Sequence, residues 1–177
     1  MIIALKDVEL KLLSELMKNS KRSDRELAQT IGVSQPTISR TRTKLEKEGY
    51  IKEYTMIPDF SKLGFELMAI TFVKFKKVLS DEQMIENRKM AEEIQKEMGY
   101  SSIMVMSAAA QGYDRAIISF HKDYSSLVKF TDRARTVPFI DLKDIINYVI
   151  PMTDVGHFQP LTLSKLANKL LQMKEKE

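Results

Sequence analysis

The fold of the first part of the chain is decided by residues 32–51, GVSQPTISRTRTKLEKEGYI. Gly32 permits a tight turn, because glycine adopts positive φ without steric cost. Ser34 is a good N-cap, and Pro36 is tolerated in the first turn of a helix. Gly49 is a typical helix terminator. The pattern therefore predicts a helix that begins just after Ser34 and ends before Gly49.

This predicted helix carries an unopposed positive charge. Arg40, Arg42 and Lys44 lie in it, and no acidic residue occurs between Val33 and Leu45. The whole chain has 28 Lys and Arg against 24 Asp and Glu, so such a local excess is unusual for it. A capped basic helix can be only a solvated surface, or it can face a polyanion.

Two shorter helices are predicted before it. The capping box of Ser23 and Glu26 starts one at Asp24, and Gly32 ends it. Ala28 lies four residues before Gly32, and its small side chain lets the paired helices approach closely. The first helix has one apolar face, made of Leu5, Val8, Leu12, Leu13 and Leu16. Residues 5–48 therefore predict a three-helix domain with a helix-turn-helix.

In that motif the last helix lies in the major groove of DNA, with its N-terminal residues toward the base edges. Arg40 is suited to guanine and Gln35 to adenine, while Lys44 and Lys47 suit phosphates. Arg42 lies near the buried side, so we expect its stem along the edge of the core and its charged head free. The predicted DNA contacts are Ser34, Gln35, Thr37, Ser39, Arg40, Thr43, Lys44 and Lys47.

Beyond about residue 60 the pattern changes to strand, helix, strand, strand, helix, strand. A capping box at Ser80 and Gln83 starts the first of these helices, and Asp123 can cap the second. This order is typical of a ferredoxin-like sandwich, with two helices on one face of an antiparallel sheet. The other sheet face is rich in apolar residues, so we infer that a second copy covers it. The predicted strands are 67–75, 102–110, 114–121 and 139–150, and the helices are 81–98 and 124–135.

The predicted fold class is therefore α+β, with an N-terminal three-helix (winged) helix-turn-helix and a C-terminal ferredoxin-like βαββαβ domain. Residues 50–57 alternate like a strand. A last amphipathic helix, with no obvious partner, is predicted over residues 160–177. The predicted divisions are 1–49 for the DNA-binding domain, 50–66 for a hinge strand and linker, 67–155 for the ferredoxin-like domain and 156–177 for the C-terminal helix.

Composition excludes several classes of protein. With 44% apolar and 29% charged residues the chain is an ordinary globular protein. Its apolar runs are too short to span a membrane, and its N-terminus does not resemble a secretory signal, so a cytoplasmic location is expected. It has no cysteine, and its two histidines, His121 and His157, lie far apart. We therefore predict no metal site and no cofactor.

Two parts of the chain resemble the Lrp/AsnC (feast/famine) family of prokaryotic transcriptional regulators. They are KDVELKLLSEL together with KRSDRELAQTIGVSQPTISRTRTKLEKEGYIKEYTMIPDFSKLG, and AAAQGYDRAIISFHKDYSSLVKF, within residues 5–153. The resemblance implies a homodimer with sheets packed face to face, often assembled into tetramers or octamers. It also implies that 50–57 is a hinge and that the second domain senses a ligand (the RAM domain). The chain departs from the family pattern at Thr41 and Arg42, in its long helix 81–98 and in its last helix.

Residues 111–114, Gln-Gly-Tyr-Asp, form a predicted hairpin turn, because glycine supplies positive φ. The family resemblance adds a role as an amino-acid effector site between dimers. Gln111, Gly112 and Tyr113 would offer main-chain donors to the carboxylate, and Asp114 would accept from the ammonium. The purely structural interpretation of the turn stays open beside this one.

The function predicted from the sequence is a sequence-specific regulator that binds double-stranded operator DNA, responds to a small effector such as an amino acid and is not an enzyme. Two alternatives remain. Some Lrp-like proteins are decarboxylases of haem biosynthesis, for which His121 and His157 would be the candidate residues. An architectural protein would instead coat DNA with little sequence preference.

Overall fold

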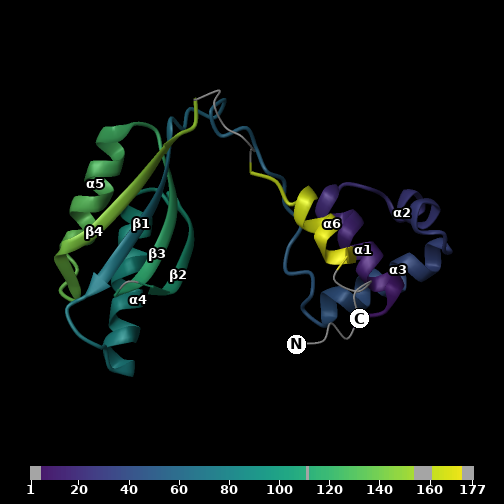
Figure 1. Ribbon diagram of the computed structural model, residues 1–177, viewed down its shortest axis with the longest axis horizontal. Coiled ribbons are helices and arrows are strands. Elements are labelled where there is room, and N and C mark those ends of the chain that lie inside the picture. Colours follow the sequence, from purple (N-terminus) through teal and green to yellow (C-terminus); the bar gives the residue numbers. More distant parts are fainter. Residues whose placement is uncertain (1–4, 111, 154–160, 173–177) are drawn as a thin grey trace. The chain divides into compact units, whose positions relative to one another are not determined.

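The computed structural model describes residues 5–110, 112–153 and 161–172. The chain divides into two compact units (Figure 1). The first unit, here called the helical unit, comprises the N-terminal part up to Ile57 together with the C-terminal segment from residue 158. The second, here called the sheet unit, runs from Pro58 to His157. The chain therefore leaves the helical unit and returns to it at its end.

The helical unit contains α1 (Asp7–Lys18), α2 (Asp24–Ile31), α3 (Gln35–Lys47) and α6 (Ser164–Gln172). The sequence-predicted start signals are confirmed. The hydroxyl of Ser23 accepts from the backbone N–H of Glu26, and that of Ser34 accepts from Thr37. Gly32 caps α2 with φ of 80°, which a side chain would strain. The tight turn between α2 and α3 thus follows directly from these residues.

The core of the helical unit lies between α1, α2 and α3. Leu12, Leu27, Ile38 and Leu45 are fully buried, and Leu10 is nearly so. Each fully buried side chain of this kind stabilises the fold by roughly 1.5–3 kcal/mol. Ile38 and Leu45 belong to α3, so the core fixes which side of α3 remains outside.

Helix α6 has a partner, which the sequence did not reveal. Ala167 is fully buried, and its carbonyl accepts from the hydroxyl of Ser14 on α1, at 3.0 Å. Leu170 and Leu171 pack against the core of the helical unit. The expectation that the last helix has no obvious partner was therefore wrong, because α6 packs on α1 as the fourth helix of the helical unit. Its periodicity indicated an apolar face but not which surface covers that face.

Residues 51–58 form no strand, contrary to the expectation for 50–57. Alternating residues favour an extended backbone, but a strand also needs a neighbouring chain to accept and donate its hydrogen bonds. No such neighbour is present for this segment in the described chain. Instead, Ile51 packs against the helical core, and the carbonyl of Thr55 accepts from the hydroxyl of Ser20 at 3.3 Å.

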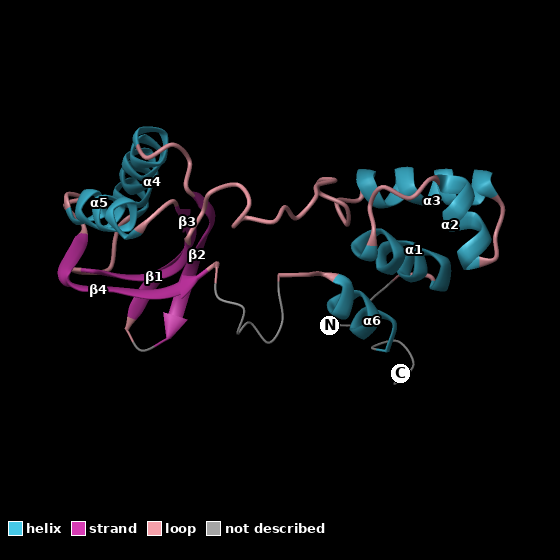
Figure 2. Cartoon of the chain, turned by 90° about the horizontal axis from the view of Figure 1, so that it is seen from above, coloured by secondary structure: helices cyan, strands magenta, loops and turns pink. Residues whose placement is uncertain are grey.

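The sheet unit contains β1 (Leu67–Phe75), α4 (Asp81–Glu97), β2 (Ser102–Ala110), β3 (Tyr113–His121), α5 (Tyr124–Arg135) and β4 (Ile140–Pro151). Its strands are ordered β2-β3-β1-β4, and every neighbouring pair is antiparallel. Figure 2 shows α4 and α5 on the same face of the sheet. The predicted ferredoxin-like arrangement is confirmed, and with it the α+β fold class.

The two faces of the sheet differ in what covers them. Thr71 of β1 donates to the side chain of Asn147, which donates in turn to Thr131 of α5, so these strand residues face the helices. Their strand neighbours Phe72 and Tyr148 therefore point to the opposite face. Tyr148 is 60% exposed there, and Ile146 and Met104 are exposed as well. This face of the sheet is apolar and has no layer over it in the described chain.

Candidate nucleic-acid interface

Helix α3 presents a polar surface on the side away from its buried residues. The exposed residues predicted to meet DNA are Gln35, Ser39, Arg40, Thr43, Lys44 and Lys47, while Thr37 is half-buried and Ser34 is exposed at the N-cap. The structure brings all eight predicted residues onto one element. It also shows that some of their polar groups are already engaged within the helix.

Three of the hydroxyl groups predicted to meet DNA form hydrogen bonds within the helix and its cap. Ser34 accepts from the backbone N–H of Thr37 at 3.3 Å, and the two hydroxyls are hydrogen-bonded at 2.8 Å. Thr43 donates to the carbonyl of Ser39 at 3.1 Å. These groups stabilise the helix start and one of its turns, which leaves Gln35 and Arg40 as the longer side chains for base contact.

Lys44 is paired with a buried carboxylate. Its Nζ donates to Glu9 of α1 at 2.7 Å and lies 3.7 Å from a carboxylate oxygen of Glu48. The Glu9 side chain is only 6% exposed, and its other oxygen accepts from the backbone N–H of Lys6. The bond from Lys44 lowers the pKa of Glu9 below its ordinary value of 4.5. Lys44 therefore neutralises a buried acid, a role that sequence reasoning missed.

Arg42 is also held within the helical unit. Its Nε and Nη2 donate to the same carboxylate oxygen of Asp24, at 2.9 and 2.6 Å. Its guanidinium also lies 5.6 Å from the ring centre of Tyr54, whose hydroxyl donates to Glu46. The expected stem along the core edge leads to a head that is bound rather than free, so that expectation was wrong. Asp24 lies in the first turn of α2, and sequence spacing gave no sign that it reaches α3.

Arg40 and Lys47 differ from these two cations. Both are exposed, and within the described residues neither forms an ion pair. Of the four cations between residues 34 and 47, these two are the ones whose charge is not compensated by the protein. An uncompensated cation on a helix surface is the group that a phosphate or a guanine edge can use.

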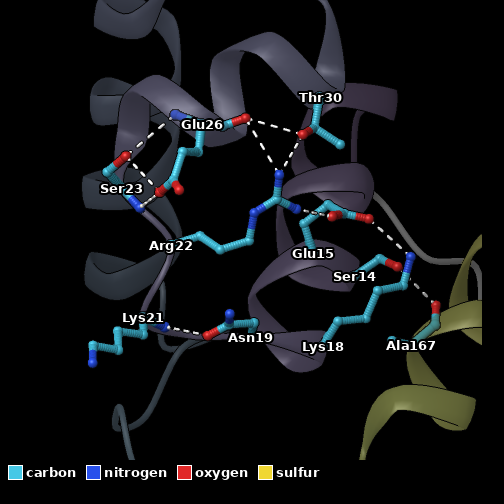
Figure 3. A network of polar contacts seen from close by, with 10 residues as sticks. All are labelled: Ser14, Glu15, Lys18, Asn19, Lys21, Arg22, Ser23, Glu26, Thr30 and Ala167. Carbon is cyan, nitrogen blue, oxygen red and sulfur yellow. Dashed lines mark hydrogen bonds and ion pairs between the residues drawn. The ribbon is translucent and has the colours of Figure 1, made fainter.

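A polar network holds α1 and α2 in place behind this surface (Figure 3). Arg22, in the turn between them, binds Glu15 of α1 and both the hydroxyl of Thr30 and the carbonyl of Glu26 in α2. The carboxylate of Glu15 also accepts from Lys18 at 2.8 Å. Arg22 therefore links α1 to both ends of α2 by polar contacts, in addition to the apolar core that the two helices share with α3.

In the predicted effector turn, Asp114 has a structural role at the end of β1. Gln111 lies outside the described residues. Gly112 has φ of 80°, and Tyr113 begins β3 with its ring 5.8 Å from that of Phe72. Asp114 accepts from the backbone N–H of Phe75 at 2.7 Å, where the pairing of β1 with β4 shifts register. One oxygen of Asp114 therefore completes the end of β1.

Of the two histidines, His121 lies in the described part of the chain, where it takes part in packing. His121 is buried, contacts the hydroxyl of Ser119 at 2.8 Å and packs against Phe130, and its burial lowers its pKa. His157 lies outside the described residues. Across the described part of the chain, no cluster of three or more acidic or histidine side chains is placed to hold a metal ion. In that same part, every helix is too short or too polar to cross a bilayer.

Comparison with known proteins agrees with this geometry. A family model described as winged helix-turn-helix DNA-binding matches residues 5–52. A helix-turn-helix transcriptional regulator of Pyrococcus abyssi, itself uncharacterised, is 36% identical over 101 residues, which are 55% of this chain and 68% of the relative. LrpC of Bacillus subtilis is 38% identical over 66 residues, covering 37% of this chain and 46% of LrpC.

Solved structures show the same fold over nearly the whole chain. The structure of Bacillus subtilis LrpC superposes with a TM-score of 0.67 at 20% identity, covering 89% of this chain and all of LrpC. A transcriptional regulator of Neisseria meningitidis, solved as a complex with L-Met, gives 0.70 at 17% identity, covering 92% and 99%.

The helix-turn-helix and the sheet unit together define a DNA-binding transcriptional regulator with a second, ferredoxin-like domain. The chain belongs to the Lrp/AsnC family of transcriptional regulators. Its relatives are regulators rather than enzymes, which argues against the decarboxylase alternative.

Proposed function

We propose that this protein binds operator DNA sequence-specifically through α3. The observation that supports this most strongly is the pair of uncompensated cations, Arg40 and Lys47, on an exposed face that carries no acid from Ser34 to Leu45. Arg40 lies in the first half of the helix and is assigned to a base edge, as is Gln35 at the N-terminus of the helix. Lys47, at the last turn, is assigned to a phosphate. The pairing of Lys44 with Glu9 makes Lys44 the weaker candidate for a phosphate contact.

The active form is proposed to be a homodimer or a larger assembly of dimers. The uncovered apolar face of the sheet, with Phe72, Ile146 and Tyr148 on it, is suited to pack against the same face of a second copy. A dimer carries two α3 helices, so its operator is expected to be a rough palindrome with half-sites about one helical turn apart.

An amino acid is the proposed effector class, bound at the turn of residues 111–114. A complex with L-Met is known for the Neisseria meningitidis relative of the same fold. The proposed donors to the carboxylate are the backbone N–H groups of Gln111, Gly112 and Tyr113. Asp114 has one oxygen committed to Phe75, so the other oxygen is the one available to an ammonium group. Binding there would shift the equilibrium between assemblies and hence the spacing of α3 helices.

Selection of binding sites from random DNA tests sequence specificity, and repeating it with a panel of amino acids tests the effector. We expect one enriched palindromic motif. An architectural protein would instead enrich no motif, and that outcome would reject sequence-specific recognition.

Substitution of Arg40 tests the assignment of the base contact. Arg40→Ala should weaken binding to the selected site by ~1–3 kcal/mol and relax the preference at one base position in each half-site. Lys47→Ala should instead weaken binding to all sequences alike and reduce the salt dependence by about one phosphate. Arg135→Ala, which removes an exposed arginine paired with Asp132 in the sheet unit, is the matched control. Unchanged affinity and preference in Arg40→Ala would show that Arg40 does not read a base.

A further inference from the structure

A cavity of about 480 Å³ lies between α4 and the sheet of the sheet unit, opens to solvent beside the exposed Arg88 and Glu92, and is lined in part by α5. Its size is within the range of pockets that hold small molecules, roughly 300–1,000 Å³. All of its lining residues belong to the sheet unit, between Val73 and Ile140, and none belongs to the turn of residues 111–114. It is therefore a separate site from the proposed effector turn.

The walls of this cavity are largely apolar. The apolar lining includes Val73 and Phe75 of β1, Ile94 of α4, Val137 between α5 and β4, and Ile140 at the start of β4. These five side chains also form a buried hydrophobic cluster of the unit. An apolar wall of this kind favours a ligand with an aliphatic or aromatic body, because burying that body removes apolar surface from water.

Arg115 of β3 gives the cavity a positive charge. The residue is half-buried, and its guanidinium lies 5.6 Å from the ring centre of Phe75, with Nη2 3.8 Å from the sulfur of Met84. None of the described carboxylates forms an ion pair with it. A half-buried guanidinium whose neighbours are a ring and a thioether lacks the anionic partner that its planar donor pair fits best.

A second polar group on the opposite wall also lacks a partner. Asn87 of α4 lines the cavity and is 8% exposed, and within the described chain its side chain makes no hydrogen bond. Since no protein group uses it, its N–H₂ group can donate to an oxygen of a ligand. The exposed Arg88 and Glu92 of α4 also line the cavity with opposite charges, so Arg115 determines the sign of the site.

From these observations we propose that the cavity binds a small carboxylic acid with an apolar body. The carboxylate pairs with the guanidinium of Arg115 and accepts from the amide of Asn87. The aliphatic or aromatic body fills the space between Phe75, Ile94 and Ile140. This site needs neither DNA nor a second copy of the chain, so its test is independent of the proposed regulatory function.

Direct binding of named probes to the full-length protein tests the proposal. The acids are 4-methylpentanoate and 3-phenylpropanoate, and the uncharged controls are their primary amides. L-leucine, which has the carbon skeleton of 4-methylpentanoate with an added ammonium group, tests whether an amino acid is required. Titration calorimetry gives affinity, and methyl NMR locates the ligand in the unmodified protein. We expect both acids to shift the methyl signals of Ile94, Ile117 and Ile140, and the amides to bind at least about tenfold more weakly.

Two arginine substitutions complete the test. Arg115→Gln keeps a long polar side chain but removes the charge, and should weaken binding of the acids by about tenfold or more. Arg135→Gln removes an exposed arginine outside the cavity and should bind as the unmodified protein does. The proposal would be overturned if neither acid bound, or if the acids and their amides bound equally well. It would also be overturned if a folded Arg115→Gln protein bound the acids with full affinity. Binding of L-leucine without 4-methylpentanoate would also overturn it, because the ligand would then need an ammonium group.

Discussion

At the scale of single residues, ion pairs decide which cations of α3 are available to DNA. Arg42 and Lys44 carry the same positive charge as Arg40 and Lys47, but Asp24 pairs with Arg42 and Glu9 pairs with Lys44. The sequence shows all four charges in one helix and shows nothing of these two acids, which come from α1 and α2. The exposed face of α3 was therefore predictable from spacing, whereas which of its cations remain uncompensated depends on tertiary contacts.

The pair of Lys44 and Glu9 leads to a prediction about stability. Lys44→Met leaves Glu9 buried without its cation, and an uncompensated buried charge is strongly unfavourable. We expect the melting temperature of the helical unit to fall by roughly 4–8 °C at neutral pH. Lys11→Met, which breaks an exposed pair with Asp7 on the same α1, should leave it nearly unchanged. Thermal melts followed by circular dichroism measure both, and an unaltered melt in Lys44→Met would restore Lys44 as a free phosphate contact.

The same pair makes stability depend on pH in a defined direction. The pKa of Glu9 is lowered in the folded protein from an ordinary value of 4.5, so its ionised form stabilises the fold. That contribution is complete above pH 4.5 and is lost as pH falls through the lower, folded pKa. Glu9→Gln removes this titration, so its melting temperature should depend less on pH below 4.5 than that of the unmodified protein. If the melting temperatures of the two proteins fell in parallel below pH 4.5, this account would be contradicted.

At the scale of elements, local signals predicted most boundaries. The capping boxes at Ser23 and Ser80 and the N-caps at Ser34 and Asp123 all function as caps in the structure. Such signals are local because a cap needs only its own first turn. The pairing of α6 with α1, in contrast, joins residues 153 positions apart at Ser14 and Ala167. No local pattern encodes that contact, so it became visible only in the folded chain.

Docking of α6 should contribute measurably to the stability of the helical unit. Ala167 is fully buried against α1, so Ala167→Arg cannot be accommodated without displacing α6. We expect a loss of about 2–4 kcal/mol in the free energy of unfolding, because the change both overpacks the contact and buries a charge. Hydrogen exchange of the backbone amides should also become faster in α1, since α1 loses the helix that packs against it.

The control for this prediction lies one position away. Leu166 is exposed on α6, so Leu166→Arg should leave both the unfolding free energy and exchange in α1 nearly unchanged. Equal exchange in α1 for Ala167→Arg and the unmodified protein would show that α6 does not stabilise α1.

At the scale of the whole molecule, the uncovered apolar face of the sheet is the surface through which two copies of the chain would pair. The helical unit supplies a single α3, which under the proposed function would meet one half-site, so a palindromic operator would require a second copy of the chain. Apolar strands predicted that one sheet face lacks cover, because two helices can cover only one face of a four-stranded sheet. The sequence did not predict the cavity beside Arg115, because that cavity depends on how α4 packs on the sheet, which no sequence pattern describes.

A charge on the uncovered sheet face should separate the copies. Tyr148 is 60% exposed on this face in the single chain, so Tyr148→Glu spares the fold but places a carboxylate where two apolar faces would meet. Sedimentation should give multiples of two chains for the unmodified protein and the single-chain mass of 20.4 kDa for Tyr148→Glu. Tyr124→Glu, at a 66% exposed position on α5 away from that face, should behave as the unmodified protein.

The Tyr148→Glu monomer should keep the melting temperature of the unmodified protein. It should lose tight binding to a palindromic site, because one α3 contributes only half of the contacts. A Tyr148→Glu protein that stays dimeric would move the interface elsewhere.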